Sequence, residues 1–438
     1  MPTPLYDALK VYASKANSRF HMPGHSGNFL PAPELQPLAP LDVTEVPGTG
    51  NLYEAGEPFD SAQALWAQAA SFDHCQFLTG GSTMGLHTGL ALLAQPGSTV
   101  LVDRGCHRSV FHAMALLDLN PVYLERPWCS GENLTGPFTP EQVATALENH
   151  PEIKTVCITS PTYSGVLSDI PVIAREIHAH GGRLLVDGAH GAHLPFLGVD
   201  AFGEADCVVV SAHKTLPAMG QTALLFTQGL DPDRVRRMAA VYGTSSPSYP
   251  MMASLDLARD WLEGEGRDAY LRTAQRVTQL REKFPSLRPG PGFALDPCRF
   301  TLKVQDGPAF ARALEERGIY PEMEDGGHVV FICTACHREE DFDRLQAALE
   351  ELKDGLGDCS PLPAPPLPEQ VRSPREALFA PTETLPLEAC EGRIAAAPLA
   401  PYPPGVPVVA PGERIGKKEL SYLARIGYNN SRVAVLKD

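Results

Sequence analysis

Short apolar segments alternate regularly with helix-like segments from about residue 59 to residue 226, and this alternation is the strongest constraint on the fold. Strands are expected at residues 75–78, 99–103, 122–124, 155–159, 183–187, 207–210 and 222–226. Helices are expected between them, several beginning at a Pro or small polar residue, at 58–71, 84–93, 109–117, 140–149 and 171–180. This order predicts an α/β domain with a mainly parallel sheet, which binds ligands at the carboxyl ends of its strands.

The rest of the chain predicts a second, smaller α/β domain. Residues 255–284 read as one long amphipathic helix, and a strand, helix, strand, helix order follows at 299–304, 310–317, 329–332 and 340–352. Residues 355–373 are Pro-rich and read as a linker, after which 374–378 and 387–393 look helical and 401–407 extended. We therefore expect an N-terminal segment at 1–58, a large ligand-binding domain at 59–284 and a C-terminal α/β domain at 285–438.

Composition excludes some classes of function. A chain of 438 residues with 43% hydrophobic residues can bury two cores, and its net charge of −16 argues against general binding to nucleic acid or anionic membranes. No apolar segment approaches the length of a membrane span, and the first residues do not resemble an export signal. The ten cysteines follow no disulfide spacing. We expect a cytoplasmic protein.

One cysteine cluster has the spacing of a covalent haem attachment site: Cys333-Thr334-Ala335-Cys336-His337. Haem attachment of this kind usually requires export, and the cluster follows an apolar segment at 329–332 that suits a strand. We favour a chance occurrence in a strand-to-helix turn over haem or metal binding, and we expect no metal site.

An acid and a lysine follow two of the expected strands. Asp187 closes the apolar segment at 184–186, and Lys214 stands in Ser211-Ala212-His213-Lys214, directly after the strand at 207–210. A pyridoxal 5′-phosphate enzyme needs a lysine that forms a Schiff base with the cofactor and an acid that keeps the pyridine nitrogen protonated. A lone lysine is usually a surface charge, but this position favours the cofactor interpretation.

The segment Thr79-Gly80-Gly81-Ser82-Thr83 fits the phosphate of such a cofactor. It follows one expected strand and begins a helix, where backbone amides and hydroxyl groups bind anions. Taken alone it is weak evidence, because Ser and Thr often cap helices for structural reasons. Ser211 is a further candidate phosphate ligand.

Two histidines are candidates for the same site. His107 lies between an expected strand and the following helix, where it either stacks on the cofactor ring or simply caps the helix. His190 follows Asp187 by three positions and is expected to line the pocket.

Together these motifs resemble the Orn/Lys/Arg decarboxylase family of fold-type I pyridoxal-phosphate enzymes. The resemblance runs in order along nearly the whole chain and includes the tail motifs Ser373-Pro374-Arg375-Glu376-Ala377, Gly392-Arg393-Ile394 and Pro411-Gly412-Glu413. Its earlier motifs are His21-Met22-Pro23-Gly24-His25, Asp42-Val43-Thr44-Glu45-Val46-Pro47-Gly48, Cys106-His107-Arg108-Ser109, Ser160-Pro161-Thr162-Tyr163-Ser164-Gly165, Asp187-Gly188-Ala189-His190 and the lysine motif.

The resemblance implies a role for each matching residue. Lys214 is the Schiff-base lysine, Asp187 the partner of the pyridine nitrogen and His107 the residue stacked on the ring. The phosphate is surrounded by Gly81, Ser82, Thr83, Ser211 and His213. In the family a neighbouring subunit completes the site, so the resemblance implies a homodimer in which Thr244 and Ser245 reach the partner's cofactor.

The expected reaction is decarboxylation of arginine, lysine or ornithine to the corresponding amine, in polyamine biosynthesis, with arginine slightly favoured. Lys214 or His213 is expected to reprotonate the carbon, and His25, Glu45 and Glu413 are candidates for substrate binding. An aminotransferase, a desulfurase or a β-eliminating lyase is the alternative, and a catalytically silent homologue is a third possibility.

The chain departs from the family pattern near the expected substrate entrance. Ser26 replaces a usual Lys, Gly50 and Asn51 lie where acidic residues are common, and Gly188 replaces an acid after Asp187. These changes leave the side-chain specificity open. The N-terminal wing of the long family members is also missing, so we expect no assembly of the kind that this wing supports.

Overall fold

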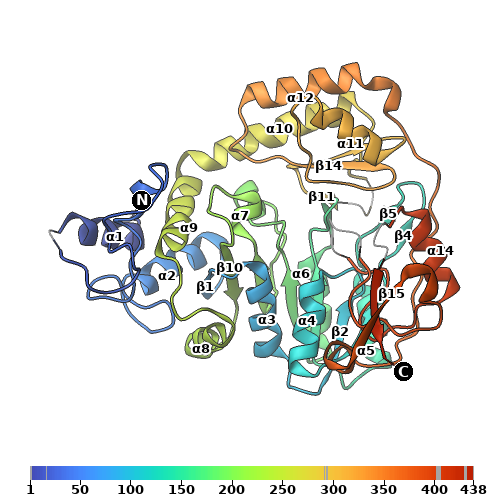
Figure 1. Ribbon diagram of the computed structural model, residues 1–438, viewed down its shortest axis with the longest axis horizontal. Helices are drawn as coiled ribbons and strands as arrows, with labels where there is room; N and C mark the ends of the chain where they lie inside the picture. Colours follow the sequence, from blue (N-terminus) through green and yellow to red (C-terminus); the bar gives the residue numbers. More distant parts are fainter. Residues whose placement is uncertain are drawn as a thin grey trace. The chain divides into compact units, whose positions relative to one another are not determined.

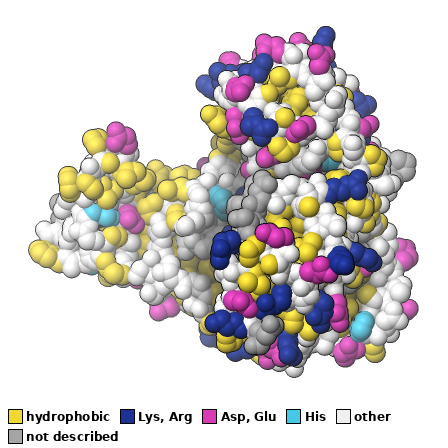
Figure 2. All heavy atoms as spheres, turned by 45° about the vertical axis from the view of Figure 1, so that its right-hand side comes forward, with side chains coloured by type: hydrophobic (Ala, Val, Ile, Leu, Met, Phe, Trp, Pro, Cys, Tyr) yellow, Lys and Arg dark blue, Asp and Glu magenta, His cyan; other side chains and the backbone are white. Residues whose placement is uncertain are grey.

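A computed structural model describes residues 2–15, 17–290, 292, 294–400, 406–428 and 432–437 (Figure 1). The chain divides into two compact units, residues 1–92 with 185–271 and residues 93–184 with 272–438. Among the described residues, every helix is too short or too polar to cross a bilayer. On the face shown in Figure 2, acidic and basic side chains are interspersed.

The predicted α/β sheet is confirmed. Its seven strands have the order β1-β10-β9-β8-β6-β2-β3. Strands β8 and β9 pair in parallel, as do β2 and β3 and β2 and β6, whereas β10 is antiparallel to both β1 and β9. The bounds are β1 (His74–Leu78), β2 (Thr99–Asp103), β3 (Asn120–Leu124), β6 (Thr155–Thr159), β8 (Arg183–Asp187), β9 (Cys207–Val210) and β10 (Ala223–Thr227).

Glycines bring helix α3 (Gly81–Leu93) close to the strands of the first unit. A Cβ atom on Gly85 would lie 2.5 Å from Val209 Cγ1, and one on Gly89 would lie 2.7 Å from Leu185 Cδ1. No larger residue fits at either position without displacing the strand side chains. This packing places the start of α3 beside the ends of β1 and β9.

Three further helices of the first unit, α1, α2 and α9, are tied together by buried polar groups. Asp256, on α9, accepts hydrogen bonds from the first amides of α1, at Leu5 (2.9 Å) and Tyr6 (3.2 Å). Trp66, on α2, donates from Nε1 to the carbonyl of Leu255 at 3.0 Å. The bounds are α1 (Pro4–Ser14), α2 (Phe59–Ala70), α7 (Ala212–Thr215), α8 (Pro232–Tyr242) and α9 (Tyr249–Trp261).

The prediction of one continuous helix over 255–284 is wrong. Helix α9 ends at Trp261, a π-helical turn covers Leu262–Gly266, and α10 (Arg267–Lys283) follows. Gly264 has non-helical angles (φ −93°, ψ −113°), which breaks the hydrogen-bond ladder. Gly266 lies against the Trp261 ring, where an added Cβ would be 2.6 Å from Cε3. Two glycines thus permit the break.

In the second unit, a small sheet of order β12-β14-β13 shares a core with residues of three helices, α10, α11 and α12. Its core includes Phe300, Leu302, Val329, Leu314 and Leu349. The bounds are α11 (Gly307–Glu315), α12 (Glu339–Glu351), β11 (Ala294–Leu295), β12 (Arg299–Lys303), β13 (Met323–Glu324) and β14 (His328–Ile332). The same unit holds α4 (Arg108–Leu117), α5 (Pro140–Asn149), α6 (Ile170–Ala179), β4 (Trp128–Cys129), β5 (Leu134–Thr135) and β7 (Val166–Leu167).

The tail forms its own core around the antiparallel pair β15 (Thr382–Pro386) and β16 (Arg432–Leu436), to which α14 (Lys417–Arg425) contributes Leu423. Helix α13 (Pro374–Phe379) packs instead against α4. The predicted helix at 387–393 is wrong beyond its first turn. A 3₁₀ turn covers Leu387–Ala389, and Gly392 then has a positive φ of 80°, which no helix accommodates. Of the predicted extended segment at 401–407, residues 401–405 lie outside the described residues.

Candidate active site

Lys214 lies in a short helix that begins directly after β9. Its Nζ atom is 3.2 Å from Nε2 of His190. Both residues belong to the first unit, and His190 is only 4% exposed. An amine held this close to an imidazole in a buried setting has a proton acceptor within reach.

Asp187 is the last residue of β8, the strand that pairs in parallel with β9. Its side chain is buried, and Oδ1 accepts the amide hydrogen of Ala189 at 3.2 Å. Parallel strands end at the same edge of a sheet, so Asp187 and the residues after β9 share that edge. The acid and the lysine predicted from sequence therefore come together on neighbouring strand ends.

Gly188 has a steric reason to be a glycine. Its amide donates to the carbonyl of Val209 at 2.8 Å, which holds this residue against β9. An added Cβ atom would lie 2.7 Å from Cε1 of Phe202, a buried ring. The acid that usually follows Asp187 in the family pattern therefore does not fit beside this ring.

His213 is fixed to the backbone. Its Nδ1 atom is 2.8 Å from the carbonyl oxygen of Thr222, just before β10. A carbonyl oxygen only accepts hydrogen bonds, so Nδ1 carries a proton and donates. This bond orients the ring and leaves Nε2 as its other polar atom.

Two buried hydroxyl groups stand at the sheet edge where a phosphate is predicted. Ser211 follows β9 and Thr79 follows β1, and the pairing of Leu78 with Ala223 and of Leu224 with Val210 places both strand ends at one edge. Ser211 is 0% exposed, and within the described parts of the chain neither Ser211 Oγ nor Thr79 Oγ1 has a hydrogen-bond partner. Such atoms fit an anion that accepts their hydrogens.

The glycine-rich loop beside these hydroxyls has a local structural role as well. Gly81 adopts φ +68° and donates its amide to the carbonyl of Gln221 at 2.8 Å. Ser82 is half-buried and Thr83 exposed at the start of α3. Their phosphate role stays a prediction.

The predicted substrate-binding residues His25 and Glu45 both lie in the first unit. His25 Nε2 is 3.2 Å from Oδ2 of Asp42, and Ser26, next to it, has a positive φ of 54°. Glu45 is half-buried and accepts a hydrogen bond from the hydroxyl of Thr44.

Sequence reasoning missed Tyr53, whose hydroxyl is buried and unpartnered among the described residues. Burial, reinforced by the charge of Glu45, raises the pKa of Tyr53 to about 12. A Cβ atom on Gly243 would lie 2.0 Å from this hydroxyl, so the loop that carries Thr244 and Ser245 packs against it. No motif surrounds Tyr53, and only its burial identifies it.

Gly50 is required by its backbone. Its φ is +70°, and an added Cβ atom would lie 2.7 Å from the carbonyl oxygen of Glu57. Its own carbonyl accepts the hydroxyl of Tyr249 at 2.6 Å. Asn51, beside it, accepts the amide of Tyr53 at 2.9 Å. An acidic residue at position 50 is therefore sterically excluded.

Thr244 and Ser245, predicted to reach a partner's cofactor, are exposed in the first unit. The amide of Ser246 donates to Thr244 Oγ1 at 3.3 Å, which shapes the loop after α8. Their predicted role stays a prediction.

His107 caps α4 in the second unit. Its Nδ1 accepts the amide of Ser109 at 3.3 Å and lies 2.9 Å from the Ser109 hydroxyl oxygen. The ring is half-buried. The capping role is thus present, while stacking on a cofactor stays a prediction.

Glu413 is completely buried in the second unit. Its Oε2 accepts from Arg104 Nη2 at 2.8 Å and from the amide of Ala410 at 2.7 Å. Burial raises the pKa of this carboxyl group, and the Arg104 charge opposes that effect. Binding of the substrate by Glu413 stays a prediction, and its carboxylate already pairs with Arg104.

The cluster with haem-like spacing lies in the turn between β14 and α12, as the chance interpretation expects. Cys333 is buried, whereas Cys336 is exposed. His337 Nδ1 accepts the amide of Thr334 at 3.1 Å.

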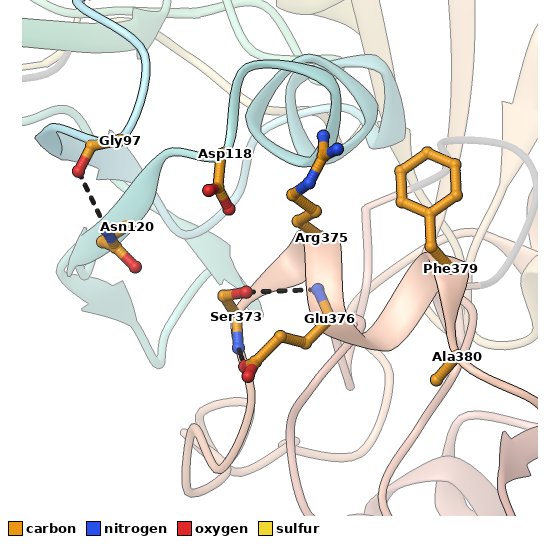
Figure 3. A pocket seen from close by; sticks show the side chains of 8 residues that line it. All are labelled: Gly97, Asp118, Asn120, Ser373, Arg375, Glu376, Phe379 and Ala380. Atoms are coloured by element: carbon orange, nitrogen blue, oxygen red, sulfur yellow. Dashed lines mark hydrogen bonds between the residues drawn. The ribbon is translucent and has the colours of Figure 1, made fainter.

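A surface cavity of about 720 Å³ in the second unit is separate from the predicted site residues (Figure 3). Arg375 donates from Nη1 to the carbonyls of Ala115 (3.0 Å) and Leu116 (3.3 Å), at the end of α4. Ser373 and Glu376 form a capping box at the start of α13. These contacts give Arg375, Ser373 and Glu376 structural roles.

Comparison with known proteins gives a consistent result. The family profile "Orn/Lys/Arg decarboxylase, major domain" matches residues 3–305, and the profile of the family's C-terminal domain matches residues 364–432. The chain is 33% identical to the uncharacterized protein YaaO of Bacillus subtilis (strain 168), over 97% of this chain and 94% of that protein. It is 29% identical to the arginine decarboxylase of the same organism, over 96% and 93%. The Escherichia coli constitutive lysine decarboxylase has a similar fold (TM-score 0.85, 21% identity, 100% of this chain and 82% of that one).

Proposed function

The chain belongs to the Orn/Lys/Arg decarboxylase family, and from this premise we propose that it decarboxylates arginine, lysine or ornithine to the corresponding amine, with pyridoxal 5′-phosphate as cofactor. One observation carries the proposal: Asp187 ends one strand, Lys214 comes shortly after the strand paired in parallel with it, and Lys214 Nζ lies 3.2 Å from His190 Nε2. This edge of the sheet thus offers the acid and the amine that the cofactor requires.

The described side chains fit the cofactor. Lys214 would bind it covalently, and the unpartnered hydroxyls of Ser211 and Thr79 would donate to its phosphate. When bound, the cofactor supplies a protonated ring that accepts the electron pair released as carbon dioxide leaves. Asp187, buried and acceptor-only when ionised, would hold the proton on the ring nitrogen.

We assign proton exchange with Lys214 to His190. The sequence offered Lys214 itself or His213 as the group that reprotonates the carbon. His213 donates its Nδ1 proton to the carbonyl of Thr222, whereas His190 Nε2 lies within hydrogen-bond distance of the lysine amine. His190 is therefore the better placed to take a proton from Lys214 or return one.

Glu45 is the better supported of the two acids proposed for the substrate's basic side chain. It shares the first unit with Lys214, and its charge helps to raise the pKa of Tyr53 and of Tyr249, so a carboxylate faces a buried polar environment there. Glu413, in contrast, already pairs with Arg104.

We propose a homodimer. Phe20, Met22 and Phe29 of the N-terminal segment are 99%, 51% and 68% exposed, which is unusual for large apolar side chains close together in sequence. A second copy of the chain would cover them, and the exposed Thr244 and Ser245 would then reach its cofactor. We place this enzyme in the cytoplasm, in polyamine biosynthesis.

The test is a panel of labelled amino acids given to the purified protein with pyridoxal 5′-phosphate. We expect release of carbon dioxide and the matching amine from at least one of arginine, lysine and ornithine. Borohydride reduction should attach the cofactor to Lys214, and Lys214→Ala should lose activity whereas Lys154→Ala, at an exposed lysine bonded to a backbone carbonyl, should keep it. Keto acid or sulfide without carbon dioxide would instead identify an aminotransferase, desulfurase or lyase and overturn the proposal.

A further inference from the structure

The loop that carries His107 begins at Arg104, and this arginine binds the tail of the chain. Arg104 Nη1 donates to the carbonyl of Pro407 at 2.7 Å, and Nη2 donates to the carbonyl of Val408 at 3.1 Å and to Glu413 Oε2 at 2.8 Å. All of these residues lie in the second unit. One side chain next to strand β2 thus holds three acceptors of the tail segment 407–413.

The Arg104–Glu413 pair is buried: its side chains are 10% and 0% exposed. Three polar atoms of the cluster, Arg104 Nε, Glu413 Oε1 and the hydroxyl of Tyr123, are buried and lack a hydrogen-bond partner among the described residues. The guanidinium lies 5.3 Å from the centre of the Tyr123 ring. Apolar residues would fill such a site with less desolvation cost, so stability alone is a poor explanation for this pair.

The strand residue just before the loop, Asp103, is also fixed by an arginine. Arg126 donates to Asp103 Oδ2 from Nη2 at 2.7 Å and from Nε at 3.1 Å. Asp103 Oδ1 in turn accepts the amide of Gly105 at 2.7 Å. The segment between Asp103 and His107 is therefore held from the sheet on one side and from the tail on the other.

We propose that Arg104 and Glu413 are a positioning pair through which the C-terminal segment fixes the loop that carries His107. Neither residue touches substrate: Glu413 acts through Arg104, and Arg104 acts through the backbone that leads to His107. This inference rests on the proposed function, because the position of His107 matters for the reaction only when a cofactor ring packs against it. It also gives Glu413 a role different from the substrate-binding one expected from sequence.

The test compares Glu413→Gln with Glu369→Gln. Gln keeps the size of the side chain and can still accept from Ala410, but it removes the charge that faces Arg104. Glu369 pairs at 2.9 Å with Arg414, the residue that follows Glu413 in the sequence. Its side chain is 69% exposed, so Glu369 is a matched surface control. Glu413→Gln should lower kcat and the affinity for pyridoxal 5′-phosphate by at least tenfold and weaken the visible circular dichroism of the bound cofactor, with KM changed less than twofold. Glu369→Gln should change none of these.

A second measurement keeps the inference testable without the cofactor. Amide hydrogen exchange of residues 104–107 in the cofactor-free protein should become faster in Glu413→Gln and stay unchanged in Glu369→Gln. If Glu413→Gln does not fold, Arg104→Lys takes its place in both measurements, because Lys lacks the two guanidinium nitrogens that make the three bonds. Unchanged exchange, or an unchanged cofactor spectrum in an active variant, overturns the inference. An inactive wild-type protein would overturn the proposed function instead, and the exchange result would still decide whether the pair fixes the loop.

Discussion

Removing the hydroxyl of Ser211 should stabilise the cofactor-free protein against unfolding and weaken its binding of the cofactor. Ser211 is 0% exposed, and its Oγ atom has no hydrogen-bond partner in the described parts of the chain. A buried hydroxyl without a partner costs about 1–3 kcal/mol. Ser211→Ala removes this cost together with the favourable burial of one small group, so the free energy of unfolding of the cofactor-free protein should rise by about 1 kcal/mol.

The cofactor-bound protein should respond in the opposite direction. If Ser211 donates to the phosphate, the bond is charge-assisted and contributes about 1.5–3 kcal/mol. Its loss corresponds to an affinity for pyridoxal 5′-phosphate that is lower by about 10- to 150-fold. Opposite signs in the two states distinguish a ligand-binding hydroxyl from a structural one.

The assay is urea unfolding of the cofactor-free protein together with cofactor titration followed by absorbance. Thr227→Val is the matched control, because Thr227 is also 0% exposed with an unpartnered Oγ1 among the described residues, but it lies at the other end of β10 from Ala223. It should gain stability in the same way and bind the cofactor normally. A Ser211→Ala variant that is destabilised and binds the cofactor like the wild type would refute the reasoning.

Two further predictions concern packing and pH. Gly188→Ala should lower the free energy of unfolding by about 1–3 kcal/mol, because its Cβ would lie 2.7 Å from Phe202. Gly220→Ala should have little effect in the same denaturation assay, because nothing lies within 4 Å of the added Cβ. Equal effects of the two substitutions would contradict this prediction. Burial lowers the pKa of His74 from 6.5 to about 4. The unfolded chain therefore binds this proton first, and stability should fall as pH drops from 6.5 towards 4. The free energy of unfolding of the His74→Asn variant should fall less than that of the wild type over that pH range. The same pH dependence in both proteins would contradict this prediction.

The strand ends of the site were predictable because their determinants are local. Apolar β-branched segments closed by polar residues identified β8 and β9, and the parallel-sheet rule then placed Asp187 and Lys214 at one edge. Strands β8 and β9 have the predicted bounds, whereas β3 begins two residues before the predicted Val122. The motif around Lys214 needed no knowledge of distant contacts.

Features that depend on distant contacts were not predictable. The Arg104–Glu413 pair joins positions 309 residues apart, and nothing in the composition around either residue reveals it. The break at Gly264 also escaped sequence reasoning, because a helix pattern tolerates isolated glycines until packing, here of Gly266 against Trp261, selects another backbone. Tyr53 became a candidate only through its burial.

The departures from the family pattern at Gly50 and Gly188 have a common steric cause. Gly50 combines a positive φ with a backbone carbonyl 2.7 Å from the place of a Cβ, and Gly188 faces the ring of Phe202 at the same distance. An acid at either position would require a different backbone or a smaller neighbour, so the missing charges are consequences of how these loops pack. The cation of a basic substrate must then be bound by a carboxylate that the packing leaves in place. In the unit that holds Lys214, we propose Glu45 for this role, so Glu45→Gln should raise KM for the amino acid while leaving the cofactor spectrum unchanged.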